Sequence, residues 1–385
     1  MDASPTPAPR SSGVDRRPRA GTFGIHQAGR TPRTRQACPL RPVRRGSLTG
    51  NGDGGALRVA QHLAVPIDTP ATLPEGFTVR PPTPADAEAI LALARAHNER
   101  IVGFADCTLD QIRDDLVEPG FDRATDGWLV HDAGGAVAGY AWSFAKGDGP
   151  EVDVDVVASD AAVARWLLAR AVARATEMAR ARGHRTSEVS AGVYRDDATL
   201  RAVAAELGFA RARTFHRMRI DHGGPRPEPA APPGVTLRRG PGDEAFARQV
   251  HAVETAAFAG HWRTSAPGYE LWRERLDAAA TTDWSQVLLA DLDGRPAGVL
   301  IGNDAFVENE RCGHVQSLGV LPESRGRGVA GHLLRRAFAD DAAKGREGTL
   351  LHVDTDNVTP ALRLYEGVGM RAVLVIDAWT RTLAV

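Results

Sequence analysis

Apolar and polar positions after residue 75 alternate in short runs that predict strands separated by helices. Two segments, 78–80 and 236–238, each begin the same series: strand, helix, hairpin, strand, long helix, strand, shorter helix and last strand. The first helices are expected at 87–95 and 245–258, with Asp86 and Asp243 as N-cap or first-turn residues. Elements in this order predict an α/β fold with a central, partly antiparallel sheet flanked by helices.

The chain from residue 75 onward contains two copies of one plan. Three anchors correspond in order: 76–80 with 234–238, 132–139 with 291–298, and 207–209 with 368–370. Their offset stays between 158 and 161 positions, so the register of the repeat barely drifts. Gly134-Gly135 and Asp293-Gly294 are the turn signals of the two hairpins. We therefore expect two tandem domains, at 75–222 and 234–385.

The segments outside the two copies have a different composition. Residues 223–233 are rich in proline, which favours extended backbone, and predict a semi-rigid linker. Residues 1–74 are dominated by Arg, Pro, Gly, Ser and Thr and predict a disordered, functionally silent tail. A transit peptide, a nucleic-acid tail and a start codon assigned too far upstream are the alternatives for this segment.

Charge and cysteine content exclude several classes of protein. The chain has 385 residues, with 47 Lys and Arg against 48 Asp and Glu, which gives no bulk attraction to nucleic acid or anionic membranes. Its three cysteines lie far apart, which disfavours a disulfide scaffold or a zinc site and fits a reducing compartment. No apolar run is long enough to cross a bilayer. We expect a cytoplasmic protein with no metal, no nucleic-acid partner and no membrane partner.

A glycine-rich turn between a strand and a helix is the most informative motif. Residues 315–321 form an apolar strand, residues 325–330 read Arg-Gly-Arg-Gly-Val-Ala, and a helical segment follows from Gly331. Glycines let backbone N–H groups approach an anion closely, and the first turn of a helix offers unpaired N–H groups to it. Arg325 and Arg327 add positive charge. This pattern predicts a site for a phosphate group.

The spacing of this motif differs from the Walker and dinucleotide-binding patterns and resembles the pyrophosphate loop of the GNAT superfamily of acetyl-CoA-dependent N-acyltransferases. A second segment supports the resemblance: strand 351–356, Asn357, and then residues 361–370, which read Ala-Leu-Arg-Leu-Tyr-Glu-Gly-Val-Gly-Met. The resemblance implies two tandem GNAT-like domains and acetyl-CoA as co-substrate. The donor would be held by a set of loop, strand and helix residues: Leu318, Gly319, Val320, Arg325, Gly326, Arg327, Gly328, Val329, Ala330 and Asn357.

The resemblance also assigns the chemistry. The strand ending at Leu321 and the strand ending near Asp354 should diverge, leaving a gap for the acyl thioester. The N–H of Leu318 or Gly319 would polarise its carbonyl. Tyr365 would protonate the departing thiolate, and Asn357 would hydrogen-bond the pantetheine arm. The alternative for Tyr365 is a helix tyrosine packed in the core, and the alternative for Asn357 is a helix N-cap.

An amine acceptor needs a group that takes its proton, because exposing a free alkylamine at pH 7 costs about 4–5 kcal/mol. Strand periodicity places His314, Gln316, Leu318 and Val320 on one face. In the family, the position of His314 often holds this base; a polar residue with no proton role is the alternative. Glu308 and Glu310, in the preceding turn, are the next candidates.

The first copy lacks the corresponding chemistry. Its strand 152–157 runs into residues 158–162 without a glycine-rich turn, and Asp160 would repel a pyrophosphate. Ala204 stands at the position of Tyr365, and Asp196 at that of Asn357. We expect a degenerate domain that does not bind CoA in the family's way. It would pack against the catalytic half, or else sense a metabolite.

The acceptor is expected to bind against residues 251–269 and 304–310. The aromatic and acidic residues in and next to the first range suit a cationic amine: Glu254, Phe258, His261, Trp262, Tyr269 and Trp272.

The leading hypothesis is an N-acetyltransferase acting on a small molecule or peptide amine by direct attack. The protein would be a monomer with a pseudo-dimer inside one chain. The tandem layout also resembles mycothiol synthases, which acetylate an amino-thiol glycoside. A non-catalytic CoA-binding regulatory protein is the third hypothesis.

Overall fold

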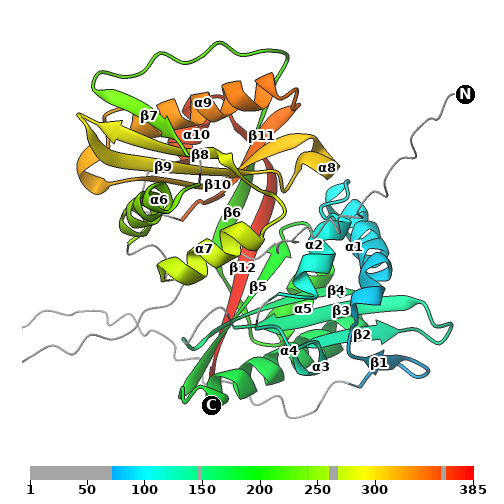
Figure 1. Cartoon of the computed structure of the whole chain (residues 1–385). Helices are drawn as coiled ribbons and strands as arrows, with labels where there is room; N and C mark the ends of the chain where they lie inside the picture. The colour runs from blue at the N-terminus through cyan, green and yellow to red at the C-terminus, as the bar shows by residue number, and fades with distance from the viewer. Residues whose placement is uncertain are drawn as a thin grey trace, which may run out of the picture.

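The computed structural model describes residues 72–385 except 119, 146–148, 159, 241, 260–267 and 357–360. One continuous sheet of twelve strands runs through this described part, in the order β1-β2-β3-β4-β5-β12-β6-β11-β10-β9-β8-β7 (Figure 1). Helices cover both faces of the sheet. The expected α/β class with a mixed sheet is confirmed.

The elements of the first half follow the predicted series, with two additional short helices. They are β1 Thr78–Arg80, α1 Ala87–Val102, α2 Leu109–Asp115, α3 Arg123–Asp126, β2 Gly127–His131, β3 Val137–Phe144, β4 Glu151–Ala158, α4 Ala161–Ala181, β5 Thr186–Tyr194, α5 Ala198–Glu206 and β6 Ala210–Asp221. The two short helices, α2 and α3, lie between α1 and the hairpin and were not predicted.

The second half repeats the series. Its elements are β7 Val235–Arg239, α6 Glu244–Ala257, α7 Tyr269–Ala278, β8 Thr282–Leu292, β9 Arg295–Asn303, α8 Val307–Glu310, β10 Cys312–Val320, α9 Val329–Ala343, β11 Gly348–Asp354, α10 Ala361–Gly367 and β12 Arg371–Ala384.

The two halves exchange their last strands. The first half's β6 lies between β11 and β12, and the second half's β12 pairs antiparallel with β5. In this register Arg217 of β6 stands opposite His352 of β11, and Trp379 of β12 opposite Ala191 of β5. The boundaries at 222 and 234 therefore divide the sequence repeat, while the sheet runs across them.

Local signals in the sequence explain several element ends. Asp293 and Gly294 both have positive φ, 51° and 79°, as a two-residue hairpin turn requires. Asp243 accepts a hydrogen bond from Phe246 N–H at 2.8 Å and caps α6 as expected. Asp86 has no such capping bond to α1; its carboxylate pairs with Arg80 instead.

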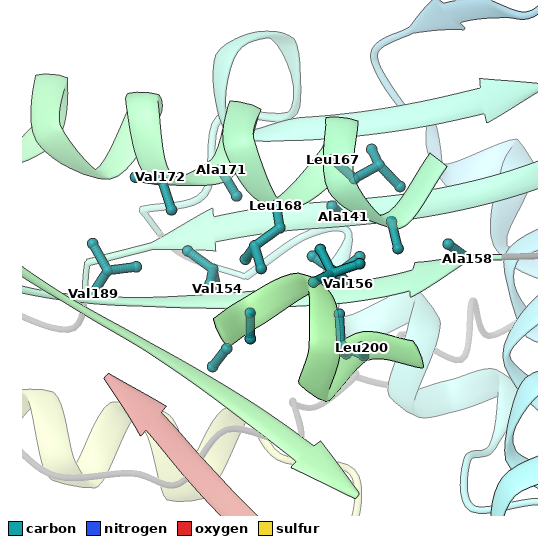
Figure 2. Close-up of a cluster of buried hydrophobic side chains, with 14 of the residues drawn as sticks. Ala141, Val154, Val156, Ala158, Leu167, Leu168, Ala171, Val172, Val189 and Leu200 are labelled. Atoms are coloured by element: carbon teal, nitrogen blue, oxygen red, sulfur yellow. The ribbon is translucent and has the colours of Figure 1, made fainter. Parts of the chain in front are cut away.

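The core of the first half lies between β4, β5 and α4. Val152, Val154 and Val156 alternate with polar residues along β4 and point to one face, where Leu167 and Leu168 of α4 cover them (Figure 2). Burying each such side chain stabilises the fold by about 1.5–3 kcal/mol. The second half has two large cores, one under α9 and α10 and one under α6 and α7, and a small cluster of Phe306, Cys312 and Leu350. No helix in the described ranges is long and apolar enough to cross a membrane.

Candidate functional site

A gap opens in the sheet of the second half between β10 and β11. The two strands pair in parallel from Cys312 opposite Gly348 to Val315 opposite Leu351, and no further. β10 nevertheless continues to Val320 and β11 to Asp354. The divergence expected from the resemblance is therefore present. The equivalent strands of the first half, β4 and β5, also stop pairing before they end.

A β-bulge in β10 changes which residues of this strand share a face, compared with the prediction. Val315 stands opposite Gly302 and Ser317 opposite Ile301, so Gln316 is an extra residue. Alternation restarts after it, and Leu318 packs with the core under α9 rather than sharing the face of His314. The prediction of one face for residues 314, 316, 318 and 320 is wrong because the bulge shifts the period of two. Ser317 and Gly319 share the face of His314, towards α6.

The backbone of Leu318 points into the gap. Leu321 N–H donates to Ala297 O of β9 at 2.9 Å, so Gly319, two residues earlier, also directs its N–H towards β9. Leu318 lies between these positions, and its N–H and C=O point away from β9, to the side from which β11 has diverged. Of the two donors considered, the geometry favours Leu318.

The glycine-rich loop follows β10 and ends at an uncapped helix. Gly326 and Gly328 have φ of 75° and 81°, a region that strongly favours glycine. Gly328 is the N-cap of α9, and no side chain caps this helix. In the first half, Asp160 accepts hydrogen bonds from Ala162 and Val163 N–H at 2.8 and 3.0 Å. An internal carboxylate thus occupies the helix start of α4, whereas that of α9 is available to an anion.

The two arginines of the loop have different surroundings. Arg325 donates to Val320 O at 3.1 Å and to Ala257 O at 3.3 Å, so its guanidinium ties the loop to β10 and α6. The Arg327 side chain is half-exposed, with its guanidinium 3.7 Å from Asp293. Arg327 is therefore the loop arginine better placed to meet a phosphate from solution.

Tyr365 lies on α10, in the core under α9 and α10. Burial raises the pKa of its hydroxyl to about 12, so the group carries its proton at neutral pH. Its face of the sheet is opposite to that of His314 and α6, and Figure 1 shows the two sets of helices on either side of the strands. Asn357, His261 and Trp262 lie outside the described residues.

His314 is held in one tautomer by Asn303. Asn303 Oδ1 accepts from Ala305 N–H at 3.2 Å, and its Nδ2 donates to Gln316 at 2.9 Å, which fixes the orientation of the amide. His314 Nδ1, 3.0 Å from that same Oδ1, must therefore carry the proton. The other ring nitrogen, Nε2, keeps its lone pair.

Burial, and then the positive charge of Arg217, lower the pKa of His314 to about 3. The ring is therefore neutral at physiological pH but a weak base, since proton transfer is most efficient when the pKa of the base lies near the working pH. The same causes, in the same order, hold the pKa of the neighbouring His352 well below its usual value. The two rings pack edge-on with centroids 5.7 Å apart.

Arg217 belongs to a buried ionic cluster that joins the two halves. Its guanidinium is fully buried and contacts Asp106 of the first half at 2.5 and 2.9 Å, and Glu310 of the second half at 2.9 Å. Its Nε donates to His352 Nε2 at 3.1 Å. Tyr194 donates to Asp106 at 2.7 Å and completes the cluster. The exchanged strand β6 thus brings a charge from the first half beside the histidines of the second.

The carboxylates that the sequence analysis singled out differ in burial and in their partners. Glu310 is engaged by Arg217 and by Arg219, at 2.9 and 3.2 Å, and Glu308 is exposed. Glu254, on α6, is half-buried and accepts from Trp272 Nε1 at 2.8 Å. Burial raises the pKa of its carboxyl, although the hydrogen bond from Trp272 and the nearby hydroxyl of Ser317 partly oppose this rise. Glu254 therefore faces β10 just beyond the bulge.

Sequence reasoning missed Asp106, Arg217, Asn303 and His352. Arg217 and His352 were detectable as polar residues inside otherwise apolar strand segments, 215–220 and 350–353. Their mutual contact follows only from the strand exchange. Within the described residues, no cluster of His, Cys, Asp or Glu has the arrangement of a metal site.

Comparison with known proteins identifies relatives over most of the chain. Residues 248–370 match the acetyltransferase (GNAT) family. Mycothiol acetyltransferase of Salinispora arenicola is 32% identical over 75% of this chain and 90% of that protein; its counterpart in Salinispora tropica is 30% identical over the same shares.

Solved structures share the fold. A GCN5-related N-acetyltransferase from Sphaerobacter thermophilus has a TM-score of 0.69 at 24% identity and covers 82% of this chain and 98% of its own. A tandem GNAT protein from the clavulanic acid biosynthesis pathway has a TM-score of 0.59 at 19% identity, with 80% and 98% covered.

Proposed function

The chain belongs to the acetyltransferase (GNAT) family, and we propose that its second half transfers the acetyl group of acetyl-CoA to a primary amine by direct attack. The observation that carries the proposal is the gap between β10 and β11, followed directly by the glycine-rich loop and the uncapped start of α9. The first half offers no equivalent anion site at α4, because Asp160 occupies the helix start. It therefore acts as a structural partner of the catalytic half.

The site residues divide the work by their positions. N–H groups of the α9 first turn, with Gly326, Gly328, Val329, Ala330 and Arg327, would hold the pyrophosphate. The open edge of β10 from Leu318 to Val320 would pair with the pantetheine arm, and Leu318 N–H would stabilise the oxyanion. Asn357 remains a predicted contact of that arm.

Acid and base would act from opposite faces of the sheet. Tyr365 lies on the side of α9 and α10, where the sulfur of CoA departs, and it stays protonated until a thiolate forms. The acceptor amine would enter from the side of α6, where His314, Ser317 and Gly319 face. The amine nitrogen attacks the carbonyl carbon, the C–S bond breaks, and sulfur takes a proton from Tyr365.

The acceptor is proposed to be a small molecule or a peptide amine. Mycothiol acetyltransferases cover three quarters of the chain, so an amino-thiol glycoside belongs in any panel of acceptors, beside peptide N-termini and polyamines. We propose a cytoplasmic enzyme, since the described cysteines, Cys107 and Cys312, are both buried free thiols.

Calorimetric titration of acetyl-CoA into the full chain and into the Gly326→Glu/Gly328→Glu variant tests the proposal. We expect micromolar binding by the unmodified protein and none by the variant, because carboxylates in the loop repel pyrophosphate. No binding by the unmodified protein would refute an acetyl-CoA-dependent reaction. Binding in both would move the donor away from this loop.

A further inference from the structure

Glu254 lies on the acceptor side of the site, and no Lys or Arg among the described residues forms an ion pair with its carboxylate. It accepts a hydrogen bond from Trp272 Nε1, and burial raises the pKa of its carboxyl, although Ser317, Trp272 and the nearby His251 partly oppose this rise. Glu310, by contrast, is engaged by two arginines. Removing a carboxylate from water without a cation is unfavourable, so a ligand cation would stabilise it.

Glu254 lies closer than His314 to the segment of β10 that borders the gap. Ser317, which faces Glu254, directly precedes Leu318, whose N–H points into the gap. Ala257, one turn further along α6, packs closely against Gly319 of β10. A Cβ atom added to Gly319 would lie 2.8 Å from the Cβ of Ala257. His314 lies further back, where β10 is still paired with β11. The carboxylate therefore faces the segment of β10 on which the acetyl group would lie.

The protein lowers the pKa of His314 and raises that of Glu254. Burial, and then the charge of Arg217, make His314 a weak base. Burial makes the carboxylate of Glu254 a stronger base than an exposed one. Of the two, Glu254 is the better match to a proton acceptor working near neutral pH.

We propose that Glu254 binds the ammonium group of the acceptor and accepts its proton, so that the acceptors are primary amines that arrive as cations. This inference rests on the proposed acetyl transfer. One ammonium proton passes to Glu254 and later to solvent, and the nitrogen lone pair forms the C–N bond. The C–S bond breaks with its electron pair on sulfur, which takes a proton from Tyr365. The second amine proton, lost as the amide forms, replaces the one that Tyr365 donates.

Steady-state kinetics with an amine found in the acceptor panel test the catalytic part. Glu254→Gln keeps the shape and removes the charge, and we expect kcat/KM to fall about 10²–10⁴-fold with acetyl-CoA affinity unchanged. The acidic limb of the wild-type pH profile should disappear in this variant. The matched control is Glu274→Gln, which changes an exposed carboxylate on α7 and should leave the profile as it is. Wild-type kinetics in Glu254→Gln would refute the proposal.

A second measurement needs no acceptor. The indole N–H of Trp272 donates to Glu254, so its ¹⁵N resonance, assigned with Trp272→Phe, reports the ionisation of the carboxyl. We expect a titration midpoint above the ordinary 4.5 in the full chain and none in Glu254→Gln. A midpoint at or below the ordinary value would overturn the inference, because the carboxylate would then be satisfied without a ligand.

The two proposals can fail separately. If acetyl-CoA does not bind, the acetyltransferase proposal fails whatever the Trp272 resonance shows. If acetyl-CoA binds and amines are acetylated, but Glu254→Gln is as active as the wild type, only the role of Glu254 is lost.

Discussion

At the scale of single residues, the site depends on side chains whose proton affinity is set by burial. Tyr365 and Glu254 hold their protons more tightly than exposed groups, and His314 less tightly. For all three, burial is the largest cause, because it disfavours the charged form of each group. The residue types were visible in the sequence, and their strengths as acids or bases were not.

Replacing Tyr365 by Phe should slow the reaction without abolishing it. A thiol pKa of about 8.5 already makes thiolate a fair leaving group, so we expect kcat to fall about 10²-fold, at the low end for general acid catalysis. Acetyl-CoA affinity should stay within a factor of about three. An unchanged kcat would leave Tyr365 with a packing role only.

His314 should make stability depend on pH. In the unfolded chain its ring binds a proton below pH 6.5, whereas in the folded protein it does so only near pH 3. Its contribution is therefore complete above 6.5 and is lost as the pH falls, by at most about 1.4 kcal/mol per pH unit. Urea unfolding of the wild type and His314→Gln between pH 7 and 5 measures the difference in slope. Parallel slopes would contradict the assigned burial.

At the scale of elements, the equivalent helices α4 and α9 differ in how their N-termini are capped. Both follow a strand that diverges from its neighbour, yet only α4 begins with a side-chain cap. A capping aspartate and a bound phosphate would satisfy the same N–H groups, so the capped start of α4 excludes an anion that the uncapped start of α9 could accept.

Asp160→Ala tests this difference. Loss of the cap should lower the free energy of unfolding by about 1 kcal/mol. Acetyl-CoA affinity should not change, because we propose that the donor binds at α9. Thermal unfolding and calorimetry of the same variant give both quantities. A drop in affinity as large as that of the Gly326/Gly328 variant would assign the donor to the first half instead.

At the scale of the whole molecule, the exchange of β6 and β12 makes the halves interdependent. Each half's sheet is completed by the last strand of the other, and the fully buried Arg217 is neutralised from both sides. The first half thus completes the sheet of the second and places the charge of Arg217 next to its histidines.

Asp106→Asn should destabilise the whole chain. Breaking one side of a buried ion pair typically costs about 3–5 kcal/mol, and Glu310 remains to partner Arg217, so we expect the lower end of that range. Asp110→Asn, which changes an exposed carboxylate on α2, is the control and should stay within about 0.5 kcal/mol. Urea unfolding measures both; equal values would show that the cluster contributes no stability.

The sequence by itself determined what is local and periodic. The repeat, the strand and helix order, the hairpin at Asp293-Gly294, the cap at Asp243 and the glycine-rich loop all follow from neighbouring residues. Each of these depends on backbone preferences over a few positions, which is why pattern reasoning reached them. The family resemblance supplied the divergence of β10 from β11.

The tertiary structure alone decided what depends on distant partners. The bulge at Gln316 changes which residues of β10 share a face, and no local pattern marks it. The strand exchange places Arg217 beside His352, 135 residues away along the chain. Burial is the main reason that His314 is a weak base, and the charge of Arg217 adds to it. The contact of Glu254 with Trp272, 18 residues away along the chain, likewise exists only in the folded chain. Electrostatic strength depends on distance and desolvation, and both are properties of the folded chain.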